Sequence, residues 1–279
     1  MSKWKCLILM AIIWTAGTAK ADFVLYGTDQ NVVDRYHLNG TLYAQSTVRI
    51  PDEFEPWSVD SLKAYHESNV YVSGGSVDDF YAYDSTTVEI SGGFVDYFHT
   101  SDSSTVEISG GSVNFVNTYS TVPMNITNGS IDYIQVNRDS IVNVFDGTID
   151  NVTTTYNGIT NIFGGDFDIV NCFAGYQYND EWVPGGTVNI SGGTINTLIA
   201  NGNYNDGVTI YARNFFLGDG LSLSDDRIIG KGILSAQWFD GTGWVMYVEA
   251  DEVGISIPEP ATLTLLIFGS VLALRRKGK

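Results

Sequence analysis

Residues 87–104 read TVEISGGFVDYFHTSDSS, and residues 105–122 read TVEISGGSVNFVNTYSTV. The two segments share TVEISGG and follow each other directly, so this part of the chain repeats every 18 residues. Related units occupy residues 69–86, 123–140, 141–158 and 159–176. A glycine recurs at one place in each unit, namely Gly75, Gly93, Gly111, Gly129, Gly147 and Gly165. A fixed period of this kind indicates supersecondary units that stack on one another.

The next copy, TVNISGGTIN, places its glycine at Gly193, so the step from Gly165 is longer than the regular period. The ten extra residues lie near 177–186, and the pattern is intact on either side of them. We therefore expect a loop that protrudes from one coil.

Three columns of apolar residues, most of them β-branched, run through the units. The first column is Val72, Ile90, Ile108, Ile126, Val144, Ile162 and Ile190. The second is Val77, Val95, Val113, Ile131, Ile149, Phe167 and Ile195, and the third is Phe80, Phe98, Val116, Ile134, Val152, Val170 and Leu198. Local alternation with period two and β-branched residues are typical of short strands, and no helical spacing persists across a unit.

Gly-Gly, Asn-Gly or Asp-Gly separates the first two columns, and these pairs tolerate the positive φ of a sharp turn. A hairpin at each pair would join unlike halves of one unit, whereas stacking unit on unit places every column residue on its counterpart. We therefore predict an all-β fold: a single-stranded parallel β-helix, or β-solenoid, with 18-residue coils. Left-handed solenoids of this coil length consist of three like hexapeptides. Because this unit does not divide into thirds, we expect a right-handed coil.

The flanking segments are rich in strand-forming residues but do not follow the period, so we expect β caps that shield the sheet edges. Trp238 and Trp244 flank Asp240-Gly241 in a predicted hairpin of the second cap. The expected divisions are a signal peptide at 1–21, an N-terminal cap at 22–68, solenoid repeats at 69–207, a C-terminal cap at 208–257 and a sorting signal at 258–279.

The N-terminus has the pattern of a secretory signal. Lys3 and Lys5 precede an apolar run, and Ala19-Lys20-Ala21 fits a small-residue cleavage site, so we expect cleavage after Ala21. An uncleaved anchor is the alternative, but the run is shorter than the roughly 20 residues of a spanning helix. Export leaves Cys172 without a partner for an intramolecular disulfide.

Without residues 1–21 and 258–279 the chain keeps 7 of its 14 basic and 31 of its 32 acidic residues, a net charge of −24. Such a surface repels nucleic acid, so we expect no nucleic-acid partner.

The C-terminus reads PEPATLTLLIFGSVLALRRKGK, in which Pro258-Glu259-Pro260 precedes fourteen mostly apolar residues and a basic end with Arg275, Arg276 and Lys277. The positive-inside rule places this end in the cytoplasm. The tail resembles the PEP-CTERM sorting signal of Gram-negative bacteria. With the N-terminal signal, we expect hydrophobic sorting helices at both ends. The resemblance implies an exosortase partner that removes the tail. It also implies transient anchoring in the inner membrane, then release to the cell surface or the exopolysaccharide matrix. The repeats in turn resemble bacterial surface β-solenoids.

One column of the repeat is polar: Asp78, Asp96, Asn114, Asp132, Asp150, Asp168 and Asn196. These side chains could accept backbone hydrogen bonds at a bend, as such residues do in turns. Alternatively, the five aspartates could form a row of oxygen ligands for Ca²⁺, although their spacing differs from the GGxGxD of calcium-binding solenoids. No other cofactor is expected.

A row of aromatic residues, Tyr97, Phe115 and Tyr133, occupies one outward position in successive units. Such rings either stabilise the stack or contact sugar rings of a polysaccharide. A polysaccharide-cleaving enzyme is an alternative, because such enzymes often use this fold. However, Arg138 is the only Lys or Arg between residues 69 and 186, and the regular column makes its aspartates equivalent.

We therefore expect no enzymatic activity and predict an exported structural or glycan-contacting protein. A lyase or hydrolase and a Ca²⁺-stabilised surface adhesin stay as alternatives.

Overall fold

The computed structural model describes residues 21–26, 30–32, 37–43, 47–50, 58–173, 176–178, 181–201, 207–224 and 227–256. The sorting residues Pro258, Glu259, Pro260, Arg275, Arg276 and Lys277 lie outside the described residues, as do both expected terminal helices. Within the described ranges there is no helix of the length and apolarity that crossing a membrane requires.

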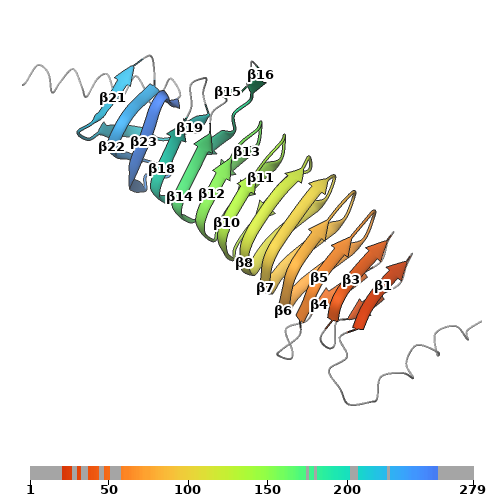
Figure 1. The fold of residues 1–279 in the computed structure, drawn as a ribbon. Coiled ribbons are helices and arrows are strands. Elements are labelled where there is room, and N and C mark those ends of the chain that lie inside the picture. The colour runs from red at the N-terminus through yellow and green to blue at the C-terminus, as the bar shows by residue number, and fades with distance from the viewer. Residues whose placement is uncertain are drawn as a thin grey trace, which may run out of the picture.

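The chain winds into an elongated β-solenoid in which every regular coil contributes one strand segment to each of two parallel rows (Figure 1). The first row precedes the glycine turn of each coil, and the second row follows it. The first row contains β2 (Gln30–Val32), β4 (Thr47–Ile50), the N-terminal parts of β6 (Asn69–Ala82), β7 (Thr87–Asp102) and β8 (Thr105–Ser120), then β9 (Met124–Ile126), β11 (Ile141–Val144), β13 (Ile159–Ile162), β17 (Thr187–Ile190) and β19 (Val208–Ile210).

The second row contains β1 (Ala21–Tyr26), β3 (His37–Tyr43), β5 (Ser58–Ala64), the C-terminal parts of β6, β7 and β8, then β10 (Ser130–Val136), β12 (Thr148–Thr154), β14 (Asp166–Phe173) and β18 (Thr194–Asn201). Like residues pair across neighbouring coils: Ile90 with Ile108, and Val95 with Val113. Each pair joins equivalent places of consecutive 18-residue units, so the predicted parallel β-solenoid is confirmed.

The three apolar columns form the core. All their members are at most 2% exposed, and they belong to one continuous cluster. Burial on both rows leaves a slender interior of β-branched and aromatic side chains. The tilted Phe80–Phe98 pair, whose ring centroids are 4.9 Å apart, fills the interior of two coils. Stacking of like on like therefore provides the core that no single coil could form.

The glycine turns require glycine for two reasons. Gly93 has a φ of +75°, and a Cβ added there would lie 2.4 Å from the carbonyl oxygen of Gly74 in the preceding coil. Gly111 repeats this arrangement one coil later, with a φ of +78°. The positive φ predicted for these pairs is confirmed, and close stacking of the turns excludes a side chain as well.

The parallel stack extends through the segment assigned to an N-terminal cap. β1 pairs with β3, β3 with β5, and β5 with β6, all in parallel. The coils here differ in length, because Val24 pairs with Thr41, Thr41 with Lys63, and Lys63 with Tyr81. The first of these separations is shorter than the period, the second is longer, and the third matches it. These strands therefore continue both rows without sharing the sequence period.

The C-terminal end changes to antiparallel pairing. β20 (Arg213–Leu217) and β21 (Leu221–Ser224) pair with β22 (Arg227–Gln237), which pairs with β23 (Gly243–Ser256). β23 also pairs in parallel with β18, so this antiparallel unit covers the last coil (Figure 1). Trp238 and Trp244 flank the turn between β22 and β23, as predicted.

The ten-residue insertion forms a small sheet of its own. β15 (Tyr176–Tyr178) and β16 (Glu181–Val183) pair antiparallel and project from the coil that contains β14 (Figure 1). The expected protruding loop is confirmed.

Candidate functional site

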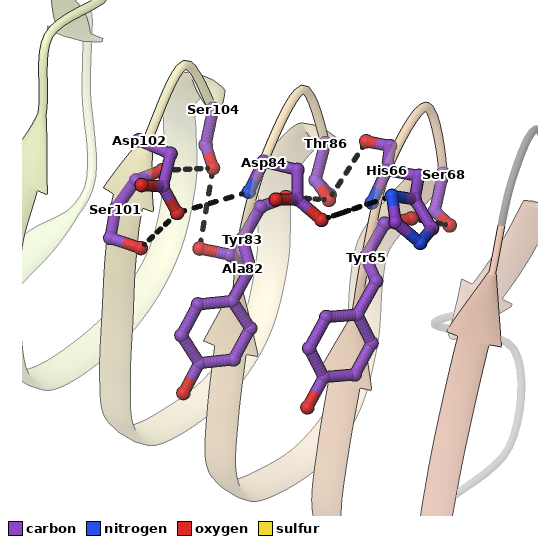
Figure 2. Close-up of polar contacts among 10 residues, drawn as sticks. All are labelled: Tyr65, His66, Ser68, Ala82, Tyr83, Asp84, Thr86, Ser101, Asp102 and Ser104. Carbon is purple, nitrogen blue, oxygen red and sulfur yellow. Dashed lines mark hydrogen bonds and ion pairs between the residues drawn. The ribbon is translucent and has the colours of Figure 1, made fainter.

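A second set of turns returns the chain from the second row to the first. We call these the hydroxyl turns, because residues 65–68, 83–86, 101–104 and 137–140 each end in Ser or Thr. The Ser68 hydroxyl donates to the Tyr65 carbonyl oxygen at 2.6 Å, and the Thr86 hydroxyl donates to that of Tyr83 at 2.7 Å (Figure 2). Ser104 makes the same bond to Ser101 at 2.7 Å.

Consecutive hydroxyl turns are joined by aspartates. Figure 2 shows the Asp84 carboxylate reaching the preceding turn, where it accepts from the backbone N–H of His66 at 3.1 Å and lies 3.2 Å from His66 Nδ1. Asp102 in turn accepts from the Asp84 N–H at 3.4 Å. His66, Asp84 and Asp102 have φ values of 60°, 56° and 59°, in the left-handed region that Asp and His tolerate better than most residues. The aspartates thus link one strained turn to the next.

The aromatic row lies on the outer side of the second row. Tyr97 stacks on Phe115 with centroids 5.5 Å apart and 12° between the planes, and Phe115 stacks on Tyr133 at 5.1 Å and 9°. All three rings are half-buried. Their flanks stay open to solvent, so the stack forms a continuous apolar strip across three coils.

An open groove of about 640 Å³ lies between this strip and the hydroxyl turns. Its lining residues come from three neighbouring coils: Tyr97, His99, Ser101, Asp102, Asn117, Tyr119, Thr121 and Arg138. The strand residues among them point outward because they alternate with buried core residues such as Phe98 and Val116. The groove therefore results from the strand pleat and the turns together.

Hydrogen bonds fix the polar side chains of the groove. Asn117 donates to the Tyr97 hydroxyl at 3.4 Å and accepts from the Asn137 amide at 3.0 Å. Asp102 accepts from the Ser101 hydroxyl at 2.8 Å. The rings of His99 and Tyr119 lie 5.5 Å apart at 44°. These groups are held in place before any ligand arrives.

Charge in the groove is mixed. The guanidinium of Arg138 lies over the Tyr119 ring, 5.7 Å from its centroid. Burial lowers the pKa of His99 below its usual range, while the nearby Asp102 carboxylate acts in the opposite direction. His99 is therefore mainly neutral at pH 7 and can donate and accept a hydrogen bond. Aromatic faces beside planar polar groups suit a sugar, whose rings have apolar faces and hydroxyl edges.

The polar column predicted as a ladder or a Ca²⁺ row lies elsewhere, just after the glycine turns. Its aspartates Asp78, Asp96, Asp132, Asp150 and Asp168 are exposed. Asp96 accepts from the Asn114 amide at 2.6 Å, and Asp168 accepts from the Asn196 amide at 3.3 Å. In the part of the chain that the structure describes, no three His, Cys, Asp or Glu side chains converge as a metal site would require.

The 18-residue period predicts the row of Tyr97, Phe115 and Tyr133 but not the rest of the groove. Tyr119 lies one coil before the 137–140 turn, one position ahead of the Arg138 column, and Asp102 shares the Arg138 column. The turn columns of the repeat therefore carry a signal that places these residues on one ridge. The approach of His99 to Tyr119 depends on side-chain direction, which the period does not give.

Comparison of the chain with protein-family models gives no match. Comparisons with curated proteins and with solved structures give no match either.

Proposed function

We propose that this protein is an exported matrix protein whose solenoid contacts polysaccharide through the groove and the aromatic strip of Tyr97, Phe115 and Tyr133. The observation that carries this proposal is the joined surface of stacked rings and fixed polar groups, which runs across neighbouring coils. A polymer could lie along such a surface and place successive sugar rings on successive residues.

Charge favours a neutral glycan over an acidic one. The span 22–257 has a net charge of −24, and Arg138 is the only Lys or Arg between residues 69 and 186. Long-range repulsion would slow the approach of a uronate polymer at low ionic strength. A neutral polymer has no such barrier and can use stacking and hydrogen bonds.

Export and sorting complete the proposal, and they rest on the sequence. The N-terminal signal pattern supports secretion, and the tail from Pro258 supports exosortase processing and transient association with the inner membrane. Release would then place the solenoid at the cell surface or in an exopolysaccharide matrix.

The test is binding of the purified full chain to neutral and acidic glycans by affinity electrophoresis. We expect Tyr97→Ala, Tyr119→Ala and Tyr133→Ala each to weaken binding to a neutral polymer about tenfold, by loss of a stacking surface. Tyr71→Ala is the matched control, because Tyr71 lies in the first row beneath the guanidinium of Arg49. Equal affinities in all four variants, with melting temperatures shifted instead, would mean that the rings only stabilise the stack.

A second candidate function is β-elimination of a uronate polymer in the same groove. It is favoured by the meeting of Arg138 with Tyr119 and a mainly neutral His99. Arg138 would neutralise the substrate carboxylate, His99 would take the proton at C5, and Tyr119 would protonate the leaving oxygen at C4. The product has a C4–C5 double bond.

Ultraviolet absorbance of that unsaturated product tests the second candidate. A signal with uronate polymers that disappears in His99→Ala and Arg138→Ala would replace the binding proposal. If the wild-type chain gives no signal with any uronate polymer of a panel, the β-elimination candidate is wrong.

A further inference from the structure

One position of the glycine turns holds an aromatic residue in two coils and a hydroxyl residue in the others. The residue before the turn is Ser73, Ser91, Ser109, Thr127, Phe145, Phe163 and Ser191 in successive regular coils. The hydroxyl side chains can hydrogen-bond to the backbone of the preceding coil. Ser191 donates to the Ile162 carbonyl oxygen at 3.3 Å, and Thr127 donates to that of Ile108 at 3.5 Å. Phe145 and Phe163 cannot do so.

The two phenylalanines contribute little to the core. They stack on each other with centroids 5.1 Å apart and 15° between planes, yet each is nearly half exposed, at 48% and 49%. Coils with Ser or Thr at this position have the same fold, so stacking of the turns does not require an aromatic residue here. Contiguous exposed apolar surface of this kind is a candidate contact surface.

The hairpin between β22 and β23 brings a third exposed ring to this place. Trp238 is buried and donates its Nε1–H to the Gly193 carbonyl oxygen at 3.1 Å, which holds the hairpin against the last glycine turn. The turn is closed by bonds from Trp238 N–H to the Thr242 carbonyl oxygen at 2.9 Å and from Thr242 N–H to Asp240 Oδ1 at 2.8 Å. Phe239, 62% exposed, therefore projects from a fixed support.

A hollow of about 320 Å³ lies between the hairpin and the solenoid. Its aromatic lining consists of the exposed Phe163 and Phe239 and the buried Trp238. Gly192 and Gly193 form part of the lining. A Cβ at Gly192 would lie 2.0 Å from the Phe163 carbonyl oxygen, so a residue with a side chain cannot occupy this position. The polar lining consists of Ser191, Thr194, Asp240 and Thr242.

We propose that this hollow is a second glycan-binding subsite, which takes a neutral pyranose unit and lets one molecule bridge two polysaccharide strands. The inference rests on the proposed glycan function and extends it. The groove lies at the hydroxyl turns, whereas the hollow lies at the glycine turns, so the two sites occupy opposite edges of the coil. From the Gly111 coil to the Gly193 coil there are four steps, about 19 Å along the axis at ~4.8 Å per strand.

The chemistry of the lining selects the ligand. The exposed rings of Phe163 and Phe239 offer apolar surface for the C–H side of a sugar. The Thr194 hydroxyl can donate and accept at the edge of the sugar, whereas the Ser191 and Thr242 hydroxyls already donate within the protein and offer their oxygens as acceptors. Hydrogen bonds from Thr242 lower the pKa of Asp240, so its carboxylate stays charged and accepts bonds at neutral pH. An acidic sugar would meet that carboxylate directly, which again favours a neutral unit.

The test counts sites on the purified full chain by isothermal titration with hexasaccharides from cellulose, laminarin and mannan. We expect two sites for at least one of these probes.

Phe239→Ala and Phe163→Ser should each remove one site or weaken it tenfold or more, while Tyr119→Ala weakens the other. Phe163→Ser introduces serine, the residue type that occupies the same position at Ser191, so the substituted coil is expected to fold. Phe216→Ala, at a ring that is 63% exposed but outside the hollow, is the control.

Bridging is measured separately, as viscosity of the corresponding high-molecular-weight polymer. Wild-type protein should raise it, and either class of single-site variant should not. One site that responds to Tyr119→Ala but not to Phe239→Ala would overturn the second subsite and leave the proposed function standing. No binding to any neutral glycan would overturn both. Phe239→Ala that instead abolishes self-association in sedimentation would make the hollow a protein contact and overturn the inference.

Discussion

Single residues in this solenoid derive their chemistry from the coil that surrounds them, and Cys172 illustrates the point. It shares a buried position with Thr154 in the preceding coil and Ala200 in the next. Its thiol donates to the Gly207 carbonyl oxygen at 3.2 Å, and burial raises its pKa to about 12. With an exposure of 1%, Cys172 packs as a small buried residue.

We therefore predict very slow alkylation of Cys172 in the folded protein. A rise in pKa from 9.0 to about 12 lowers the thiolate fraction at pH 8 about a thousandfold, and burial restricts access further. Mass spectrometry after iodoacetamide treatment of the purified protein measures the rate, with urea-unfolded protein as the reference. Rapid alkylation under native conditions would show that this coil opens readily.

The same shift predicts how stability depends on alkaline pH. The folded pKa is raised, so the contribution of the protonated thiol is fully present below about pH 9 and decreases as the pH rises toward 12. Between these values the unfolded chain ionises first, which favours unfolding. Cys172→Ala should remove this part of the pH dependence in urea titrations.

Among the elements, the turn decides whether one coil can lie on the next. Glycine turns combine a positive φ with close backbone contact, whereas the Gly241 turn has a φ of +96° and only an Arg213 side-chain atom, at 3.6 Å, near its missing Cβ. The two kinds of turn therefore separate the cost of backbone strain from the cost of a clash.

We predict that Gly93→Ala destabilises the protein far more than Gly241→Ala. The latter should cost about 1–2 kcal/mol, from the left-handed backbone alone. Gly93→Ala adds a Cβ at 2.4 Å from a carbonyl oxygen that cannot move without shifting the preceding coil, so we expect more than about 3 kcal/mol. Urea unfolding followed by circular dichroism measures both. Equal losses would mean that the stacked turns adjust freely.

Side-chain ladders add to the stacking of strands. Asn143 donates to Asn125 at 3.0 Å, Asn161 to Asn143 at 2.9 Å, and Asn189 to Asn161 at 2.9 Å. Earlier in the same column, Glu89 pairs directly with Glu107. Like charges placed opposite each other are destabilising, whereas an amide within the ladder both donates and accepts. The side-chain hydrogen bonds of this column are therefore better satisfied in its C-terminal half.

The whole molecule carries its acidic charge on a narrow rod, so its stability should depend on salt. At ~0.1 M ionic strength charges interact over about 10 Å, which is about two coil steps, and at ~1 M over about 3 Å, which is less than one. We predict that the melting temperature of the purified protein rises with NaCl over this range, because repulsion along each acidic column is screened. A melting temperature that does not change with NaCl would contradict this account.

Calcium provides the comparison for that prediction. Specific binding by Asp78, Asp96, Asp132, Asp150 or Asp168 would raise the melting temperature at millimolar Ca²⁺ beyond NaCl of equal ionic strength. Since Asn114 and Asn196 already bond two of these carboxylates, we expect CaCl₂ and MgCl₂ to act alike. A rise with CaCl₂ alone would favour the adhesin alternative.

How much could be predicted from sequence differs along the molecule. The coils from β6 to β18 follow from the columns because the same short segment repeats, and the insertion and the Trp238–Trp244 hairpin have local signals. The coils formed by β1 to β5 do not, because their unequal lengths break the period even though the strands pair in the same rows. Right-handedness stays a prediction.

The repeat is enough to specify that like residues stack, since a recurring strand and turn can bury its apolar columns only against its own copies. Where the two surface sites lie follows only from the packed molecule. The groove depends on side-chain directions at turns with positive φ, and the hollow depends on the β22–β23 hairpin folding back onto Gly193, far earlier in the chain than Trp238. Such long-range contacts arise from packing among several elements, and no local pattern specifies them.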